Sequence, residues 1–255
     1  MASNGVERPR AVLFDLDDTL AESFKPPAPE MIESLKKLLK LRPIAILTAA
    51  GFPRIEAQFL EHFSDHPNIA DFYIFPNSAA ECFRWDGSAW KREYDEELSE
   101  IERAMITNAI RESAAETGAT TGTGFEPQII DRGAQIAYAI LGLEAPFEAK
   151  RSWDPDRKKR TLLQQAIMKR VPDFEIRIGG MTTIDITKKG VDKAYGVRWL
   201  SKYLEIPASE MLYIGDALYE GGNDAVVIPT GIQTRAVEDP TETLAVIADL
   251  LTSCA

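Results

Sequence analysis

Short runs of consecutive apolar residues recur along the first part of the chain, and helical patterns separate them. The runs at 11–14 and 44–47 predict strands that are buried on both faces, and residues 71–75 predict a third strand. Residues 30–40 place apolar side chains at helical spacing, and the stretch after Gly51 predicts another helix. This alternation of strand and helix is typical of a parallel sheet with helices on both faces.

The same alternation returns near the end of the chain. The pattern predicts a helix at 191–204, a buried strand at 211–214, a further strand at 225–228 and a final helix at 240–251. We therefore expect an α/β fold with a doubly wound, Rossmann-like parallel sheet.

The middle of the chain has a different order of elements. It predicts a helix, two strands, a second helix and two more strands, which form an α+β unit inserted into the α/β domain. The expected elements are a hairpin around Asp86-Gly87, a helix at 97–114, a Gly/Thr-rich loop at 117–124, strands at 128–131 and 134–141, a helix at 161–171, and strands at 174–178 and 182–186. We expect the catalytic domain to comprise residues 1–85 and 188–255, and the inserted domain residues 86–187.

The amino-acid composition argues against several classes of protein. Hydrophobic residues make up 45% and charged residues 27% of the chain, as in ordinary globular proteins. The formal net charge of −11 gives no basic surplus for nucleic acid, and no apolar run approaches the roughly 20 residues of a membrane helix. Cys82 and Cys254 have no metal-ligand spacing and, without a predicted secretion signal, indicate a reducing cytoplasm. The oligomeric state stays open.

Polar residues follow the predicted strands at the edge where an open parallel sheet binds ligands. Asp15, Thr48 and Asp216 each stand at the carboxyl end of an apolar run. If the segment stays extended, Asp15 and Asp17 point the same way, and two close carboxylates need a cation between them. Mg²⁺, a hard dication that prefers oxygen ligands, fits this set, to which Asp216, Asn223 and Asp224 can contribute.

Lys193 adds a positive charge near this edge. It stands in the first turn of a predicted helix, where a lysine opposes the helix dipole unless an anion binds there. Carboxylates with Mg²⁺, a lysine, backbone amides and the hydroxyl of Thr48 describe a phosphate site. A carboxylate there can attack phosphorus and form an aspartyl-phosphate.

Four segments in the right order resemble the motifs of the haloacid dehalogenase superfamily of phosphotransferases. They are FDLDDTL at 14–20, ILTAAG at 46–51, GVDKAYG at 190–196 and IGDALYEGGND at 214–224. The resemblance implies that Asp15 is the nucleophile and Asp17 the general acid and base. It implies that Thr48 and Lys193 bind the phosphoryl group. The metal set that it implies is Asp15, Asp17 through its backbone carbonyl, and Asp216, with Asn223 and Asp224 supporting the acidic loop.

The inserted domain resembles the α/β cap of the sugar-phosphatase and phosphomannomutase branch. The resemblance lies in the GGND loop, in GGMTTID at 179–185 and in DRG at 131–133. It implies that Arg132, Thr183 and Asp185 bind the distal part of the substrate. Two places depart from that branch, because Gly142-Leu143 stands where a Gly-Arg pair is typical and Lys25 where an arginine is typical.

These observations predict an enzyme of the phosphoric monoester hydrolase class. We expect a Mg²⁺-dependent phosphatase that hydrolyses a small phosphorylated metabolite, a sugar phosphate by resemblance. A phosphohexomutase related to the phosphomannomutases is the first alternative. A non-catalytic phosphate-binding or interaction module is the second.

Overall fold

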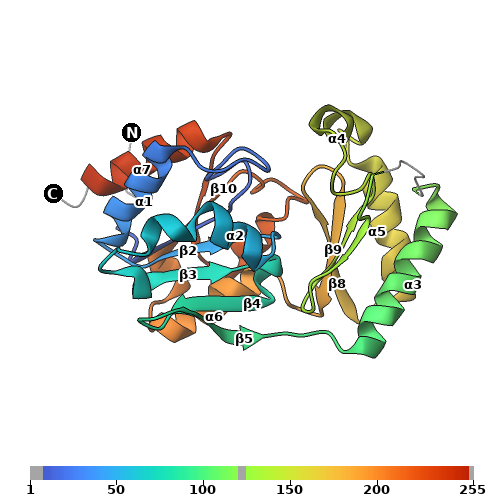
Figure 1. Ribbon diagram of the computed structural model, residues 1–255, viewed down its shortest axis with the longest axis horizontal. Coiled ribbons are helices and arrows are strands. Elements are labelled where there is room, and N and C mark those ends of the chain that lie inside the picture. The colour runs from blue at the N-terminus through green and yellow to red at the C-terminus, as the bar shows by residue number, and fades with distance from the viewer. Residues whose placement is uncertain (1–7, 120–124, 253–255) are drawn as a thin grey trace. The chain divides into compact units, whose positions relative to one another are not determined.

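The chain divides into two compact units in a computed structural model that describes residues 8–119 and 125–252 (Figure 1). The larger unit comprises residues 1–94 and 193–255, and the smaller unit comprises residues 95–192. Part of the predicted loop at 117–124 and Cys254 lie outside the described residues. None of the helices in the described ranges combines the length and the apolar character that a membrane span needs.

A seven-stranded sheet in the order β11-β10-β1-β2-β3-β4-β5 forms the centre of the larger unit. The five strands from β11 to β3 are parallel, and β4 pairs with β3 in the antiparallel sense. The strands are β1 (Ala11–Phe14), β2 (Ile44–Leu47), β3 (Phe72–Phe75), β4 (Glu81–Trp85), β5 (Trp90–Asp95), β10 (Met211–Gly215) and β11 (Gln233–Ala236).

Helices cover both faces of this sheet, which confirms the predicted fold class. Val12 and Phe14 of β1 pack into one core with α1, α2 and α7, whereas Ala11 and Leu13 pack into a second core with α6. Because both faces of β1 are buried, its sequence is an uninterrupted run of apolar residues. The helices are α1 (Pro29–Leu39), α2 (Phe52–Gln58), α6 (Lys193–Leu204) and α7 (Pro240–Thr252). Short 3₁₀ helices occupy Leu60–Phe63, Ile69–Asp71, Asn77–Ala79, Ala208–Glu210 and Ala225–Thr230.

The strand predicted at 225–228 is wrong. These residues form the 3₁₀ helix Ala225–Thr230, which contains Pro229 and buries Val227 completely. The strand that pairs with β10 is β11, whose polar sequence QTRA carries no apolar run.

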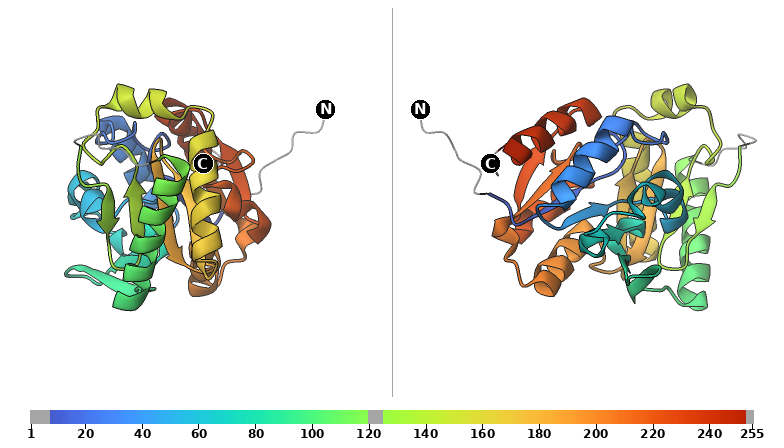
Figure 2. Two further views of the ribbon diagram at one scale, coloured as in Figure 1. Left: turned by 90° about the vertical axis from the view of Figure 1, so that its right-hand side faces the viewer. Right: turned by 60° about the vertical axis from the view of Figure 1, so that its left-hand side comes forward.

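The smaller unit has a four-stranded sheet in the order β6-β7-β9-β8, with every pair antiparallel. Its strands are β6 (Ile129–Asp131), β7 (Ile136–Ala139), β8 (Phe174–Gly179) and β9 (Thr183–Lys188). Helices α3 (Glu100–Thr117) and α5 (Lys158–Arg170) lie side by side on one face of it (Figure 2). A short helix, α4 (Phe147–Trp153), was not predicted.

The boundaries between the units lie later in the chain than the predicted 85/86 and 187/188. The hairpin around Asp86-Gly87 joins β4 to β5, and both strands belong to the large sheet, so the smaller unit begins at Asp95. It ends at Asp192, directly before α6.

Candidate active site

Three polar residues predicted for the site follow three neighbouring parallel strands. Asp15 comes directly after β1, Thr48 after β2, and Asp216 after β10. Strand β1 pairs with both β2 and β10, so these residues stand at the same edge of the sheet. This edge is the carboxyl end of the strands, where open α/β sheets bind their ligands.

Lys193 connects two carboxylates at this edge. It is the first residue of α6, and its Nζ donates to Oδ1 of Asp15 at 2.5 Å and to Oδ1 of Asp224 at 2.7 Å. All three side chains are buried, with Lys193 only 2% exposed. A buried ammonium is stable only where anions compensate its charge, which these two carboxylates do.

Asp224 accepts three hydrogen bonds from three different residues. Besides Lys193, the hydroxyl of Tyr213 donates to its Oδ1 at 2.6 Å, and the backbone N of Ala217 donates to its Oδ2 at 3.0 Å. A Cβ on Gly215 would lie 2.4 Å from Oδ2 of Asp224, so only glycine leaves room for this carboxylate. The main chain at the end of β10 is thus shaped around Asp224.

The charges at this edge do not balance within the protein. Asp15, Asp216 and Asp224 each offer an oxygen within 4.8 Å of the others, and Lys193 supplies one positive charge to this group. Burial and the neighbouring carboxylate of Asp224 raise the pKa of Asp216 to about 6. Burial also raises the pKa of Asp15, against the opposing effect of Lys193. A hard dication would relieve this excess of negative charge, so the donor set fits Mg²⁺.

Asp17 is not part of this group of three carboxylates. Arg54 donates from Nη1 to Oδ2 of Asp17 at 2.8 Å and from Nη2 to Oδ1 at 2.5 Å, and the backbone N of Phe24 donates to Oδ1 at 3.1 Å. The expected convergence of Asp15 and Asp17 assumed an extended segment. The strand ends at Phe14, however, and Asp18 adopts a φ of 60°. The alternation rule does not apply to such a turn.

Thr48 lies directly after β2, whereas Asn223 is adjacent to Asp224 in the loop after β10. The side chain of Thr48 is buried, and its Oγ1 accepts from the backbone N of Ala50 at 3.1 Å, which leaves the hydroxyl proton available to an acceptor. Asn223 precedes Asp224 in the loop after β10, and its side chain makes no hydrogen bond to another described residue that would place it in the site.

Sequence reasoning missed three residues that organise the site. Arg54 holds Asp17, Tyr213 holds Asp224, and Oγ1 of Thr19 accepts from the backbone N of Asp216 at 3.1 Å. A signal existed for Arg54, because it stands in the first turn of α2, where a cation opposes the helix dipole as Lys193 does. Tyr213 lies inside a buried strand, so the sequence pattern indicates only an ordinary core residue there.

The residues expected to bind the distal part of a substrate all lie in the smaller unit. Thr183 and Asp185 share one face of β9, while Ile184 and Ile186 of the same strand pack into the hydrophobic core. Arg132 follows β6, and its Nη1 donates to Oε1 of Gln135 at 2.8 Å. The predicted separation of polar and apolar faces is therefore present in β9.

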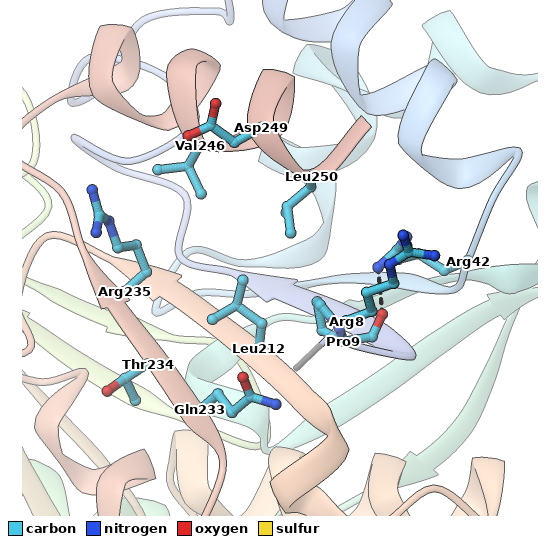
Figure 3. Close-up of a pocket in the computed structure, with 10 residues that line it drawn as sticks. All are labelled: Arg8, Pro9, Arg42, Leu212, Gln233, Thr234, Arg235, Val246, Asp249 and Leu250. Atoms are coloured by element: carbon cyan, nitrogen blue, oxygen red, sulfur yellow. Dashed lines mark hydrogen bonds between the residues drawn. The ribbon is translucent and has the colours of Figure 1, made fainter. Parts of the chain in front are cut away.

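A cavity of about 270 Å³ lies elsewhere in the larger unit (Figure 3). Its lining includes Pro9, Arg42, Leu212 and Gln233, which stand before or near the start of strands rather than at their carboxyl ends. It contains no residue of the predicted site.

Comparison with known proteins gives one family match and several relatives. The family model for haloacid dehalogenase-like hydrolases matches residues 150–249. The chain is 24% identical to a phosphomannomutase of Spinacia oleracea, over 83% of each chain. It is 25% identical to phosphomannomutase 2 of Dictyostelium discoideum, over 93% of this chain and 94% of the relative.

Solved structures share the fold at lower identity. An IMP-bound IMP-nucleotidase of Plasmodium falciparum aligns with a TM-score of 0.72 at 19% identity, over 96% of this chain and 69% of that one. A trehalose-6-phosphate phosphatase of Aspergillus fumigatus aligns with a TM-score of 0.55 at 12% identity, over 96% of this chain and 93% of that one.

Proposed function

The chain is a member of the haloacid dehalogenase superfamily, and on that premise we propose that it is a Mg²⁺-dependent phosphatase. Its substrate is a small phosphorylated metabolite of the sugar-phosphate class. The reaction passes through an aspartyl-phosphate on Asp15. A cytoplasmic location is part of the same proposal and rests on the sequence alone.

One observation carries the proposal: a buried lysine bridges the predicted nucleophile and a second carboxylate. Lys193 donates to both Asp15 and Asp224 at the carboxyl edge of the sheet. This arrangement orients one oxygen of Asp15 and places a positive charge next to the position where a phosphoryl oxygen develops charge. A purely structural ion pair would not need a third carboxylate, Asp216, beside it.

In the first step, a carboxylate oxygen of Asp15 forms a bond to phosphorus while the ester P–O bond breaks. Asp17 gives a proton to the departing oxygen, and Lys193 together with Thr48 neutralises the phosphoryl oxygens. In the second step, Asp17 takes a proton from water, whose oxygen attacks phosphorus and releases Asp15. Bound Mg²⁺, held by Asp15, Asp216 and Asp224, would reduce the repulsion between the nucleophile and the anionic substrate.

Asp17 must leave its ion pair with Arg54 before it can transfer a proton to the leaving oxygen. Its carboxylate is engaged by the guanidinium of Arg54 through two hydrogen bonds. Proton transfer requires the carboxyl group to lie within hydrogen-bond reach of the leaving oxygen. We assign the paired form to a resting state from which Asp17 rotates when substrate binds.

The smaller unit supplies substrate recognition in this proposal, so we call it the cap. Thr183 and Asp185 offer one hydroxyl and one carboxylate on the same face of β9, and Arg132 adds a guanidinium. Such groups bind the hydroxyls of a leaving group rather than the reacting phosphorus. Mutation of them should therefore change substrate preference more than chemistry.

A phosphohexomutase is the second candidate. The curated relatives named above are phosphomannomutases and are matched over 83% and 94% of their own lengths. A mutase returns the phosphoryl group from Asp15 to the substrate, whereas a phosphatase transfers it to water. Phosphate release measured against isomerisation of a hexose phosphate separates the two.

The decisive experiment is hydrolysis of p-nitrophenyl phosphate by the purified chain, with Mg²⁺ and with excess EDTA. We expect turnover only with the metal, and none in the Asp15→Asn variant, whose side chain has the same shape. A chain that binds phosphate but never turns over would instead be a non-catalytic binding module. Activity that survives in both EDTA and Asp15→Asn would refute the proposed mechanism.

A further inference from the structure

The cavity of about 270 Å³ in Figure 3 lies between α7 and the strands β10 and β11, and we call it the α7 cavity. Val246 and Leu250 of α7 point toward Leu212 of β10 (Figure 3). All three side chains are apolar, and those of Val246 and Leu250 are only partly buried. This part of the cavity therefore offers apolar surface that a small ligand can cover.

The polar sequence of β11 explains why α7 leaves space here. Strand register places Gln233 beside Leu212, and it places Arg235 beside Ile214. Leu212 and Ile214 belong to the core against which α7 packs, so the two polar residues of β11 lie on the same face of the sheet. Burial of such polar groups against an apolar helix costs free energy. The apolar residues of α7 therefore do not close onto this edge strand.

Arginine side chains stand around the apolar part of the cavity. Arg235 lies on one side of it in Figure 3, and Arg42 lies on the other, where its Nη1 donates to the neutral backbone carbonyl of Pro9. Arg8 also lines the cavity, and Asp249 contributes a carboxylate to the lining. Three positive charges against one negative charge leave the lining residues with a formal excess of two positive charges.

An excess remains when the surface partner of Arg235 is counted as well. Nη2 of Arg235 lies 3.9 Å from Oε1 of Glu242, and the two side chains are 58% and 38% exposed. Such a long, solvated ion pair leaves Arg235 able to bind another anion. With Glu242 included, one positive charge is left at a cavity of a chain whose formal net charge is −11. The local field, rather than the net charge, favours an anion here.

The α7 cavity is separate from the candidate active site. Leu212 is the second residue of β10, and Asp216 directly follows that strand, so about 13 Å of extended chain lies between them. None of the residues predicted for the active site lines the cavity. A ligand in the cavity therefore leaves the carboxyl edge of the sheet open to substrate.

We propose that the α7 cavity binds a small organic anion, in which a carboxylate or a comparable anionic group is attached to a flat apolar ring. The anionic group pairs with Arg235 and Arg42, and the ring lies between Leu212 and the apolar side chains of α7. The volume suits one small molecule rather than a segment of peptide. Binding here does not depend on the proposed function, because it needs neither Mg²⁺ nor turnover.

The test measures binding of 2-naphthoate to the purified chain by isothermal titration calorimetry in excess EDTA. The alcohol 2-naphthalenemethanol has the same ring without the charge, and acetate has the charge without the ring. We expect 2-naphthoate to bind at one site with a Kd of about 1 mM or tighter. The other two probes should bind at least about fivefold more weakly, because each lacks one of the two interactions.

Arg235→Gln should weaken binding of 2-naphthoate by about three- to tenfold and change binding of the neutral alcohol by less than about twofold. Arg10→Gln is the matched control. The side chain of Arg10 is 55% exposed and pairs with Glu210, much as Arg235 pairs with Glu242, but Arg10 does not line the cavity. The Kd of this control should stay within about twofold of wild type, because solvent screens the charge.

Val246→Phe places a ring in the cavity and keeps every arginine, so it should remove binding of both ring-containing probes. Thermal unfolding shows whether this variant is folded, and the comparison of Arg235→Gln with Arg10→Gln carries the test if it is not. Wild-type affinity in folded Val246→Phe would overturn the proposal, because the probe would then bind elsewhere. No binding of 2-naphthoate up to about 10 mM, or equal losses in Arg235→Gln and Arg10→Gln, would also overturn it.

Discussion

The guanidinium of Arg54 donates two hydrogen bonds to the carboxylate of Asp17, one to each oxygen. The guanidinium also lies 5.4 Å from the ring centre of Phe24, whose backbone N donates to the same carboxylate. The carboxylate of Asp17 is thus held outside the group formed by Asp15, Asp216 and Asp224. The proposed role of Asp17 as the general acid therefore requires this ion pair to open during the reaction.

Asp17→Asn should distinguish substrates by their leaving group. Hydrolysis of an alkyl phosphate needs a proton donor and should slow by about 10²–10⁴-fold, whereas p-nitrophenolate leaves without protonation and should be affected much less in the first step. Burst kinetics separate the first step from the second, in which Asp17 is also required. Equal losses in the burst phase for both substrates would contradict the assignment of Asp17 as the acid.

Arg54→Gln tests whether the ion pair restrains Asp17. Because both side chains are partly exposed, the loss of the pair should lower the free energy of unfolding by only about 1 kcal/mol. Turnover of the alkyl phosphate should rise by about two- to fivefold if breaking the pair contributes to the barrier. An unchanged or slower alkyl-phosphate reaction would show that the pair does not limit catalysis.

Asp15→Asn and Asp224→Asn should separate catalysis from stability. The first removes the nucleophile and should reduce kcat by at least about 10³-fold, while Lys193 keeps Asp224 as a partner. The second removes the negative charge that compensates Lys193 and replaces one accepting oxygen with an NH₂ group, so it should lower the free energy of unfolding by about 2–4 kcal/mol. Urea unfolding of both variants without metal measures the difference, and a larger loss of stability in Asp15→Asn would contradict these roles.

Binding of Mg²⁺ should depend on pH through Asp216. Burial and Asp224 raise its pKa to about 6 from a usual value of 3.8. Between these values the folded state holds a proton that the unfolded state has lost, so the metal-free protein loses stability from this group as pH rises through the window. The metal needs the ionised carboxylate, so its stabilising effect should be larger at pH 7.5 than at pH 5.

Thermal unfolding with and without Mg²⁺ across this range measures the effect. Asp216→Asn should weaken or remove the stabilisation by Mg²⁺ at pH 7.5. A metal effect of the same size at pH 5 and pH 7.5 in the wild-type chain would show that protons do not compete for the site.

The hydrophobic pattern predicted those strands whose two faces are both buried. It identified β1, β2, β3 and β10, because alternate residues of these strands pack into different cores. It failed for β11, an edge strand of sequence QTRA with three exposed residues, because an exposed strand needs no apolar run. At 225–228 the β-branched residues favoured a strand, but the chain follows a 3₁₀ helix there and buries only Val227 fully.

The sequence predicted the positions of those candidate site residues that directly follow a strand. Asp15, Thr48 and Asp216 lie at one edge of the sheet because neighbouring parallel strands end there, and Lys193, the first residue of α6, donates to Asp15. The direction of Asp17 could not be predicted, because it depends on the turn after Asp15. Backbone bonds such as Leu20 N to Leu16 O define that turn.

Gly215→Ala tests whether the backbone at the end of β10 is shaped around Asp224. The new Cβ would lie 2.4 Å from Oδ2 and 2.8 Å from Cγ of Asp224, and the carboxylate cannot withdraw without giving up Lys193, Tyr213 and Ala217. We expect a loss of about 2–3 kcal/mol in the free energy of unfolding and a lower kcat/KM, since Lys193 also orients Asp15. A double-mutant cycle with Asp224→Ala measures the interaction directly, because the added methyl group should cost little once the carboxylate is absent. If the effects of the two substitutions on the free energy of unfolding are additive, the loss in Gly215→Ala does not come from a clash with the carboxylate of Asp224.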